Sequence, residues 1–217
     1  LWFAELLSVI FMLLLTTALI YGTWFHFQRS FDWAAPLWSR DSSIDISLPA
    51  IPAMVRELDE PYALVQWTVT IYMFASAFGQ LLWGPASDRF GRKAMLTGGL
   101  IFYFSGSVIC VLAPDITTLL AGRALQGFGA SAAIVMSRAF IRDLYSGEEL
   151  ARNLALATMF FALGPIIAPF VGSGLASMFG WRAIFVALVA WSLLLLAMMH
   201  GVPETLKVRQ ARALSPA

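Results

Sequence analysis

The stretch AMLTGGLIFYFSGSVICVLA, residues Ala94–Ala113, runs for 20 residues without a charged side chain. A helix that crosses a bilayer needs about 20 mostly apolar residues, because the hydrocarbon core is roughly 30 Å thick and each helical residue rises about 1.5 Å. We therefore predict that this stretch forms a transmembrane helix.

Four other segments of the chain have the same apolar character. They are Tyr62–Ala86, Ile116–Ser137, Asn153–Met178 and Trp181–Gly201. Of the 217 residues, 59% are hydrophobic and only 12% are charged, whereas a soluble domain carries roughly a quarter charged residues. Together with one preceding crossing, these segments predict an all-α fold, a polytopic membrane bundle of about six transmembrane helices.

Positive charge alternates between the connections that join these segments. Ser87–Lys93 and Arg138–Arg152 are rich in arginine, whereas Pro114–Asp115 and Phe179–Arg182 carry a single arginine between them. Lysine and arginine in short loops are retained on the cytoplasmic side of a membrane. The two arginine-rich connections are therefore predicted to face the cytoplasm, and the segment before Pro61 to face outside.

Composition and residue usage exclude several classes of function. The formal net charge is only +1, so no basic surface indicates a nucleic-acid partner. Cys110 is the only cysteine, which excludes a disulfide framework and a multi-cysteine metal site. His26 and His200 lie far apart and lack ligand-type neighbours. Because the sequence also lacks a nucleophile elbow, we expect that the protein is not an enzyme and that it binds no metal ion and no cofactor.

The crossing that precedes these five segments has two candidates. Leu1–Phe25 carries one charge, but the chain from there to residue 60 would then form an unusually long outer loop. Phe31–Val55 would carry Arg40, Asp41 and Asp45 into the membrane. A charge at the bilayer centre costs about 2.5 to 3.5 kcal/mol on insertion scales. The first candidate is therefore favoured, unless the charges pair or face water.

Arg123 lies in the middle of the predicted crossing Ile116–Ser137. It is about eight residues, or roughly 12 Å of helix rise, from the outer end of that segment, so its side chain cannot easily reach the surface. An arginine at such a depth usually faces a bundle interior or an aqueous cavity and pairs with an acid. The alternative is a structural arginine that caps backbone carbonyls.

Asp45 is the acid at a matching depth, if the helix that contains Ile44–Pro52 ends outside near Arg56. Pairing with Arg123 would weaken its affinity for a proton, and burial would strengthen it. A substrate that disturbs the pair could then change the protonation, which is the physical requirement of a proton-coupled carrier. The alternative places Asp45 in an outer loop as an ordinary polar residue.

Small residues and prolines mark the surfaces where helices are expected to meet. Gln126 and Gly127 follow Arg123 within one helical turn. The small residues that repeat at intervals of four in the next crossing are Gly164, Ala168 and Gly172. Residues at this spacing share a face and allow close packing, while Pro165 and Pro169 remove backbone donors and bend the helix. Candidate cavity-lining residues on the second crossing are Tyr72, Met73 and Gln80.

The charged segment from Gly84 to Lys93 ends one helix and begins the next within a few residues. Gly91 permits the tight turn. Asp88 is expected just before the following helix, where the positive end of the helix dipole favours a carboxylate. Arg89 and Arg92 are expected to hold the cytoplasmic side, and the alternative is an ordinary well-capped charged loop.

Three of these motifs, in this order, resemble those of the major facilitator superfamily. They are GPASDRFGRK at residues 84–93, similar to its signature loop, RALQGFGA at residues 123–130, similar to its fourth-helix motif, and LGPIIAPFVG at residues 163–172, similar to the antiporter motif of its fifth helix. Within that superfamily, the sequence resembles the Bcr/CflA drug-resistance branch in four further segments. They are SIDISLPAIP at residues 43–52, RAFIRDL at residues 138–144, GWRAIF at residues 180–185 and PET at residues 203–205.

The resemblance implies proton-driven efflux of small drugs, such as bicyclomycin, chloramphenicol or sulfonamides, across the bacterial inner membrane. It implies that Asp45 and Arg123 are the membrane-embedded charges and that the loop around Asp88 is a cytoplasmic latch. The latch residues would be Gly84, Asp88, Arg89, Gly91, Arg92 and Lys93. The expected partners are a drug, a proton and membrane lipid.

The chain matches only the first half of that family, whose carriers have about twelve crossings in two similar halves. The expected domains are an atypical apolar segment and linker at residues 1–42, the six-helix half at residues 43–206 and a cytoplasmic tail or linker at residues 207–217. Transport is then expected only if a C-terminal half or a second copy completes the cavity. Two alternatives are a metabolite carrier of the same superfamily and a truncated membrane fragment that does not transport.

Overall fold

The chain folds into helices throughout the described region. The structure is a computed structural model that describes residues 46–199, except for the side chains of residues 160–163. The elements in chain order are η1 (Leu48–Ala50), α4 (Ile51–Leu58), α5 (Tyr62–Phe90), α6 (Arg92–Leu112), α7 (Ile116–Leu144), α8 (Gly147–Phe179) and α9 (Arg182–Met198). No strand occurs among residues 46–199, and the predicted all-α membrane bundle is confirmed.

Three helices, α6, α7 and α8, have the length and the apolar composition of membrane-crossing segments. The helix α9 is also apolar but shorter, with 17 residues. The helix α5 has 29 residues, and serine, threonine and glutamine residues occur along its length. Those polar residues are the first indication that α5 borders more than lipid.

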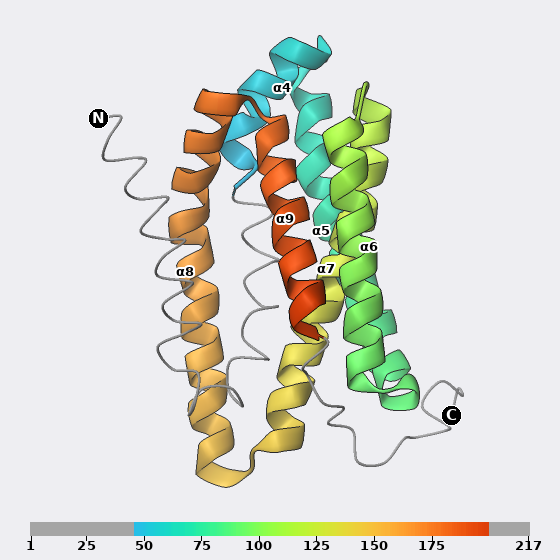
Figure 1. Cartoon of the computed structure of the whole chain (residues 1–217), viewed down its shortest axis with the longest axis vertical. Coiled ribbons are helices and arrows are strands. Elements are labelled where there is room, and N and C mark those ends of the chain that lie inside the picture. Colours follow the sequence, from blue (N-terminus) through green and yellow to red (C-terminus); the bar gives the residue numbers. More distant parts are fainter. Residues whose placement is uncertain (1–45, 200–217) are drawn as a thin grey trace.

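Close approach between helices builds the centre of the bundle. The helix α7 packs against both α5 and α6, and α6 also packs against α9, while α8 runs along the side (Figure 1). A Cβ at Gly99 would overlap the side chain of Ala132, and a Cβ at Gly106 would lie 2.5 Å from the backbone nitrogen of Gln126. Glycine is therefore required where α6 crosses α7.

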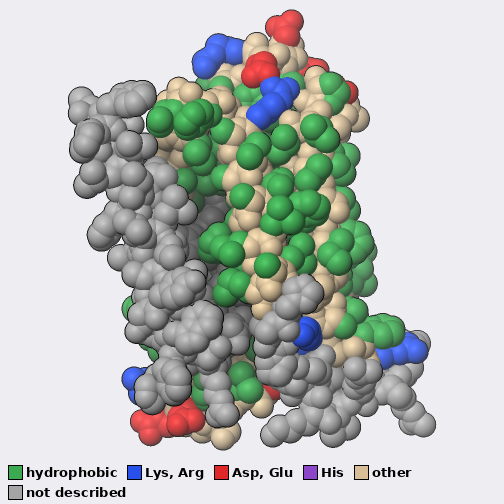
Figure 2. Space-filling view, in the orientation of Figure 1, with side chains coloured by type: hydrophobic (Ala, Val, Ile, Leu, Met, Phe, Trp, Pro, Cys, Tyr) green, Lys and Arg blue, Asp and Glu red, His purple; other side chains and the backbone are tan. Residues whose placement is uncertain are grey.

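The outer surface has the pattern of a protein in a bilayer. Figure 2 shows hydrophobic side chains over the middle of one face and charged side chains at its two ends. Large apolar side chains such as Phe74, Leu81 and Phe170 are each more than 70% exposed. A soluble monomer rarely exposes apolar surface on this scale, so these side chains are placed to contact lipid or another protein segment.

The arginine-rich connections are shorter than the sequence predicted. Gly91 alone separates α5 from α6, with φ of 106° and ψ of 148°, a conformation that strains any residue with a Cβ. The helix α5 therefore continues to Phe90, and Asp88 lies in its last turn. The prediction that Asp88 lies just before the next helix is wrong, because Asp88 is part of α5.

The chain before α5 is helical from Leu48 to Leu58. Residues 48–58 form η1 and α4, and α4 ends at Leu58, close to Arg56, which was the condition for Asp45 to lie at the depth of Arg123. A loop at residues 48–58, which the first candidate implied, is not observed. Leu1–Phe25, Asp45 and the domain boundaries at residues 42 and 206 lie outside the described residues.

Candidate functional site

Arg123 is fully buried at the centre of the bundle, with no exposed surface. Its Nη1 donates to Oε1 of Gln126 at 2.7 Å, one turn further along α7. Its Nε donates to the backbone carbonyl of Thr68 on α5 at 3.3 Å. Its Nη2 donates to the hydroxyl of Ser47, just before η1, at 3.3 Å. Three separate parts of the chain therefore hold one guanidinium.

Two aromatic rings complete the surroundings of this cation. The guanidinium carbon lies 4.5 Å from the ring centroid of Tyr72 on α5 and 5.8 Å from that of Phe185 on α9. Cation–π attraction is stronger where water is excluded, and it can reach about 2 kcal/mol or more. Tyr72 and Phe185 are both almost completely buried, so they fix the plane and position of Arg123 within the membrane-spanning region.

Gly127 explains how α5 comes close enough to supply two of these contacts. A Cβ at this position would overlap the backbone of Tyr72. Without a side chain at Gly127, the two helix backbones meet directly, which brings the Thr68 carbonyl within reach of Arg123. The small residue beside the arginine therefore positions the site through the spacing of α5 and α7.

The predicted cavity residues separate into two groups. Tyr72 and Gln126 lie against Arg123. Met73 is 53% exposed and does not contact Arg123 in the described contacts of that side chain. Gln80 is half-buried two turns beyond Tyr72, and its amide donates to the carbonyl of Ser76 in its own helix at 3.3 Å. Asp45 lies outside the described residues, although Ser47, two positions later, touches the guanidinium.

Three contacts of the arginine were not predicted from the sequence. Ser47 and Phe185 lie inside the segments at residues 43–52 and 180–185 that carried the family resemblance, so the motifs held a signal for both. Thr68 contributes a backbone carbonyl, which no side-chain pattern reveals. Within residues 46–199, no three His, Cys, Asp or Glu side chains group as metal ligands.

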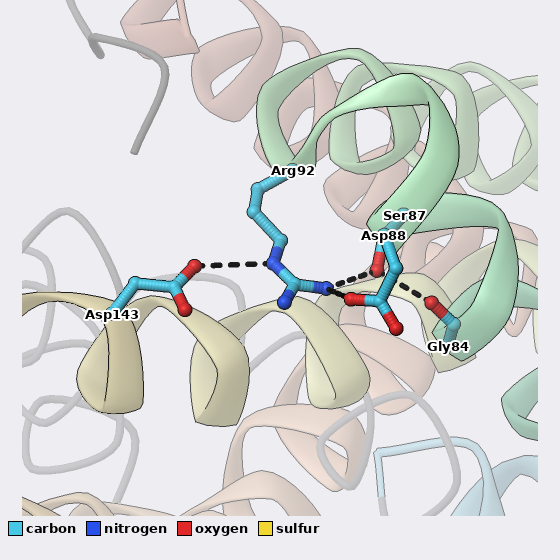
Figure 3. A network of polar contacts seen from close by, with 5 residues as sticks. All are labelled: Gly84, Ser87, Asp88, Arg92 and Asp143. Carbon is cyan, nitrogen blue, oxygen red and sulfur yellow. Dashed lines mark hydrogen bonds and ion pairs between the residues drawn. The ribbon is translucent and has the colours of Figure 1, made fainter. Parts of the chain in front are cut away.

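At the opposite end of the bundle from α4, Arg92 joins three helices (Figure 3). Its Nη1 lies 2.5 Å from a carboxylate oxygen of Asp88, and its Nε donates to the carboxylate of Asp143 on α7 at 3.1 Å. Nη1 also donates to the hydroxyl of Ser87 at 2.5 Å, and Ser87 donates to the carbonyl of Gly84 at 2.7 Å. This network fixes the α5–α6 turn to the end of α7.

The other predicted latch residues have different surroundings. Arg89 is exposed, and its guanidinium lies 5.2 Å from the ring centroid of Phe90. Lys93 is half-buried in the first turn of α6. Gly91 forms the turn between the helices. Asp88 and Arg92 therefore form the ion pair of this predicted latch.

The stripe of small residues on α8 packs against the start of the described chain. Gly164, Ala168 and Gly172 are all buried. A Cβ at Gly172 would overlap the backbone carbonyl of Ile46. The helix continues without a break through Pro165 and Pro169. The stripe therefore lets α8 pack closely against residues 46–47. Ser47 in this segment contacts Arg123.

A second polar cluster lies at the end of the bundle that carries α4. Arg182 at the start of α9 pairs with Glu57 on α4 and donates to the carbonyl of Ala113, at the end of α6, at 3.0 Å. Trp181 donates to Glu57 at 2.7 Å. The hydrogen bond from Arg182 lowers the pKa of Glu57 below its usual value, although partial burial acts in the opposite direction. This cluster ties α4, α6 and α9 together.

The chain resembles known transporters in sequence and in fold. A model of the Major Facilitator Superfamily matches residues 37–215. The chain is 34% identical over 165 residues to a bicyclomycin resistance protein homolog of Haemophilus influenzae, covering 76% of this chain and 42% of that protein. It is 33% identical over 168 residues to multidrug resistance protein D of Escherichia coli K12, covering 77% of this chain and 43% of that protein.

Among solved structures, the human organic anion transporter MFSD10 has a TM-score of 0.68 to this chain. The sequence identity is 20%, and the match covers 86% of this chain and 50% of that one. At this identity the likeness shows the fold. The chain spans less than half the length of the two bacterial relatives that it resembles.

Proposed function

This chain belongs to the major facilitator superfamily, and we propose that it forms the N-terminal half of a proton-coupled carrier that exports small drugs across the bacterial inner membrane. The class of substrate is supported by the two bacterial relatives, whose names refer to drug resistance. The observation that carries the coupling is the fully buried, precisely held cation of Arg123.

The proposed coupling acid is Asp45. Ser47, two positions after it, accepts a hydrogen bond from Arg123, which supports a location of the acid near the guanidinium. A nearby cation favours the ionised carboxylate, whereas removal from water favours the protonated form. Drug that enters the cavity beside this pair would shift the balance, and export in exchange for protons requires that bound drug favour the ionised carboxylate, so that bound drug and bound proton exclude one another.

A second half is required to complete the cavity in this proposal. Carriers of this kind bind substrate near the bilayer midplane, between two repeats that rock against each other. The partner is a C-terminal half or a second copy of the chain. The network of Arg92, Asp88 and Asp143 is proposed to be the cytoplasmic latch, because it fixes one end of α5, α6 and α7 as a unit.

Transport in everted membrane vesicles tests the proposal. The chain, expressed together with its second half, is expected to accumulate chloramphenicol or bicyclomycin when a proton gradient is imposed, and to lose that accumulation when a protonophore is added. Each charge moved through 100 mV supplies about 2.3 kcal/mol, which supports a concentration ratio of roughly fiftyfold. Vesicles that contain Arg123→Ala serve as the matched control.

The same vesicles distinguish the alternatives. Uptake that does not depend on the gradient would contradict proton coupling. Gradient-dependent uptake of a sugar or an amino acid in place of the drugs would identify a metabolite carrier. No flux of any tested compound, with both halves inserted, would identify the chain as a membrane fragment that does not transport.

A further inference from the structure

A chain of buried hydrogen bonds leads from Arg123 into the interface between α6 and α7. Beyond Gln126, the amide Nε2 donates to the hydroxyl of Ser107 on α6 at 2.8 Å. The Ser107 hydroxyl in turn donates to the backbone carbonyl of Tyr103 at 2.8 Å. Arg123, Gln126 and Ser107 all have 0% exposed surface, so water cannot replace a partner that is lost.

The chemistry of the groups fixes the direction of this chain. A guanidinium has donors and no acceptor, so the carbonyl oxygen of Gln126 must face Arg123. The amide nitrogen of Gln126 then points into α6, where a buried donor needs an acceptor. The hydroxyl oxygen of Ser107 is that acceptor, and the Ser107 hydroxyl donates its own proton to the carbonyl of Tyr103.

The packing of α6 on α7 makes the contact possible. A Cβ at Gly106 would lie 2.5 Å from the backbone nitrogen of Gln126 and 2.7 Å from the carbonyl oxygen of Gly122. The backbones therefore approach so closely that the short side chain of Ser107 reaches the amide. Ser105, two residues earlier on the same helix, donates only to the carbonyl of Ile101 in its own helix, at 2.8 Å.

We propose that Ser107 is a positioning residue for Arg123 and acts through the amide of Gln126. This inference rests on the proposed function, in which an accurately placed guanidinium couples drug movement to proton movement. Without the hydroxyl of Ser107, the amide turns to find another acceptor, and Arg123 loses the oxygen that fixes its Nη1. Ser107 lies outside every motif that supported the family resemblance.

Two transport rates separate this role from simple packing. Gradient-driven uptake of chloramphenicol requires coupling, whereas exchange of labelled for unlabelled drug without a gradient requires only binding and rocking. Ser107→Ala is expected to lower the gradient-driven rate about tenfold, because one buried hydrogen bond is lost. The KM and the rate of exchange are expected to stay within about twofold of those of the unsubstituted protein. Ser107→Thr keeps a hydroxyl and is expected to restore most of the driven rate. Ser105→Ala is the matched control and is expected to change neither rate.

A double substitution tests the path through Gln126. If Ser107 acts through that amide, Ser107→Ala lowers the driven rate no further in a Gln126→Ala background, because coupled residues are not additive. Losses of the driven rate that add up in the double variant would overturn the inference. It would also be overturned if Ser107→Ala lowered the driven rate and the exchange rate equally, or if Ser107→Ala behaved like Ser105→Ala. If the unsubstituted protein shows no gradient-driven flux, the proposed function fails first, and this inference fails with it.

Discussion

Arg123, in the middle of α7, donates a hydrogen bond to the hydroxyl of Ser47, 76 residues earlier in the chain, at 3.3 Å. Ser47 is 4% exposed and precedes the first described helix. The contact ties the start of the described chain to the centre of the bundle.

Removal of the buried cation should abolish coupling while the protein still inserts. Arg123→Ala is expected to lower gradient-driven drug uptake about tenfold or more, because several buried hydrogen bonds to a charged group are lost together. Immunoblots of the vesicles would show that the amount of inserted protein is similar. The control is Arg152→Ala, which removes an exposed arginine on α8. A variant that builds up the normal drug ratio would refute the role of Arg123.

Two glycines on α8 offer a matched pair for the packing of the small-residue stripe. Gly172→Ala is expected to lower stability by roughly 1 to 3 kcal/mol, because the new methyl group overlaps the backbone of Ile46. Gly174→Ala meets no atom within 4 Å and should be neutral or slightly stabilising. Thermal unfolding in detergent measures both. Equal melting temperatures for the two variants would show that α8 does not pack on Ile46 through this face.

The network at the α5–α6 turn should contribute to stability through Arg92. Arg92→Met leaves two carboxylates, Asp88 and Asp143, facing each other without their shared cation. The expected loss is about 1 to 2 kcal/mol, since hydrogen bonds to charged groups are stronger than neutral ones. Arg89→Met is the comparison, because this exposed arginine lies against the neighbouring ring of Phe90. Its effect is expected to stay below about 0.5 kcal/mol.

The cluster at the α4 end predicts a dependence of stability on pH. The pKa of Glu57 lies below its usual value of 4.5, chiefly through the hydrogen bond from Arg182. A group with a lowered pKa contributes stability that is fully present above the unfolded pKa and is lost as the pH falls through the folded one. Glu57→Gln should therefore melt at a lower temperature than the unsubstituted protein at neutral pH.

The difference between these two proteins is expected to shrink as the pH falls below 4.5, because Glu57 is protonated first in the unfolded state and, at a lower pH, in the folded state as well. Melting temperatures measured stepwise from neutral to acidic pH test this expectation. A gap that stays constant over the whole range would show that the ion pair with Arg182 does not contribute to folding.

The sequence by itself located the crossings and the buried charge. Apolar length is a property of a local stretch, so Ala94–Ala113 and its neighbours could be recognised without any contact between them. The depth of Arg123 followed from its distance to the end of its segment, and 0% exposure agrees with that reading. The ordered motifs were equally local, and they identified the family correctly.

The tertiary structure decided which groups meet. Thr68 and Phe185 reach Arg123 from two other helices, and one of them offers only its backbone. The charged segment around Asp88 is helical up to Phe90, because a single glycine makes the turn and Arg92 pairs with both Asp88 and Asp143. Apolar length and charge act within a segment, whereas the partners of a buried polar group depend on how separate helices pack, and only the folded bundle specifies that packing.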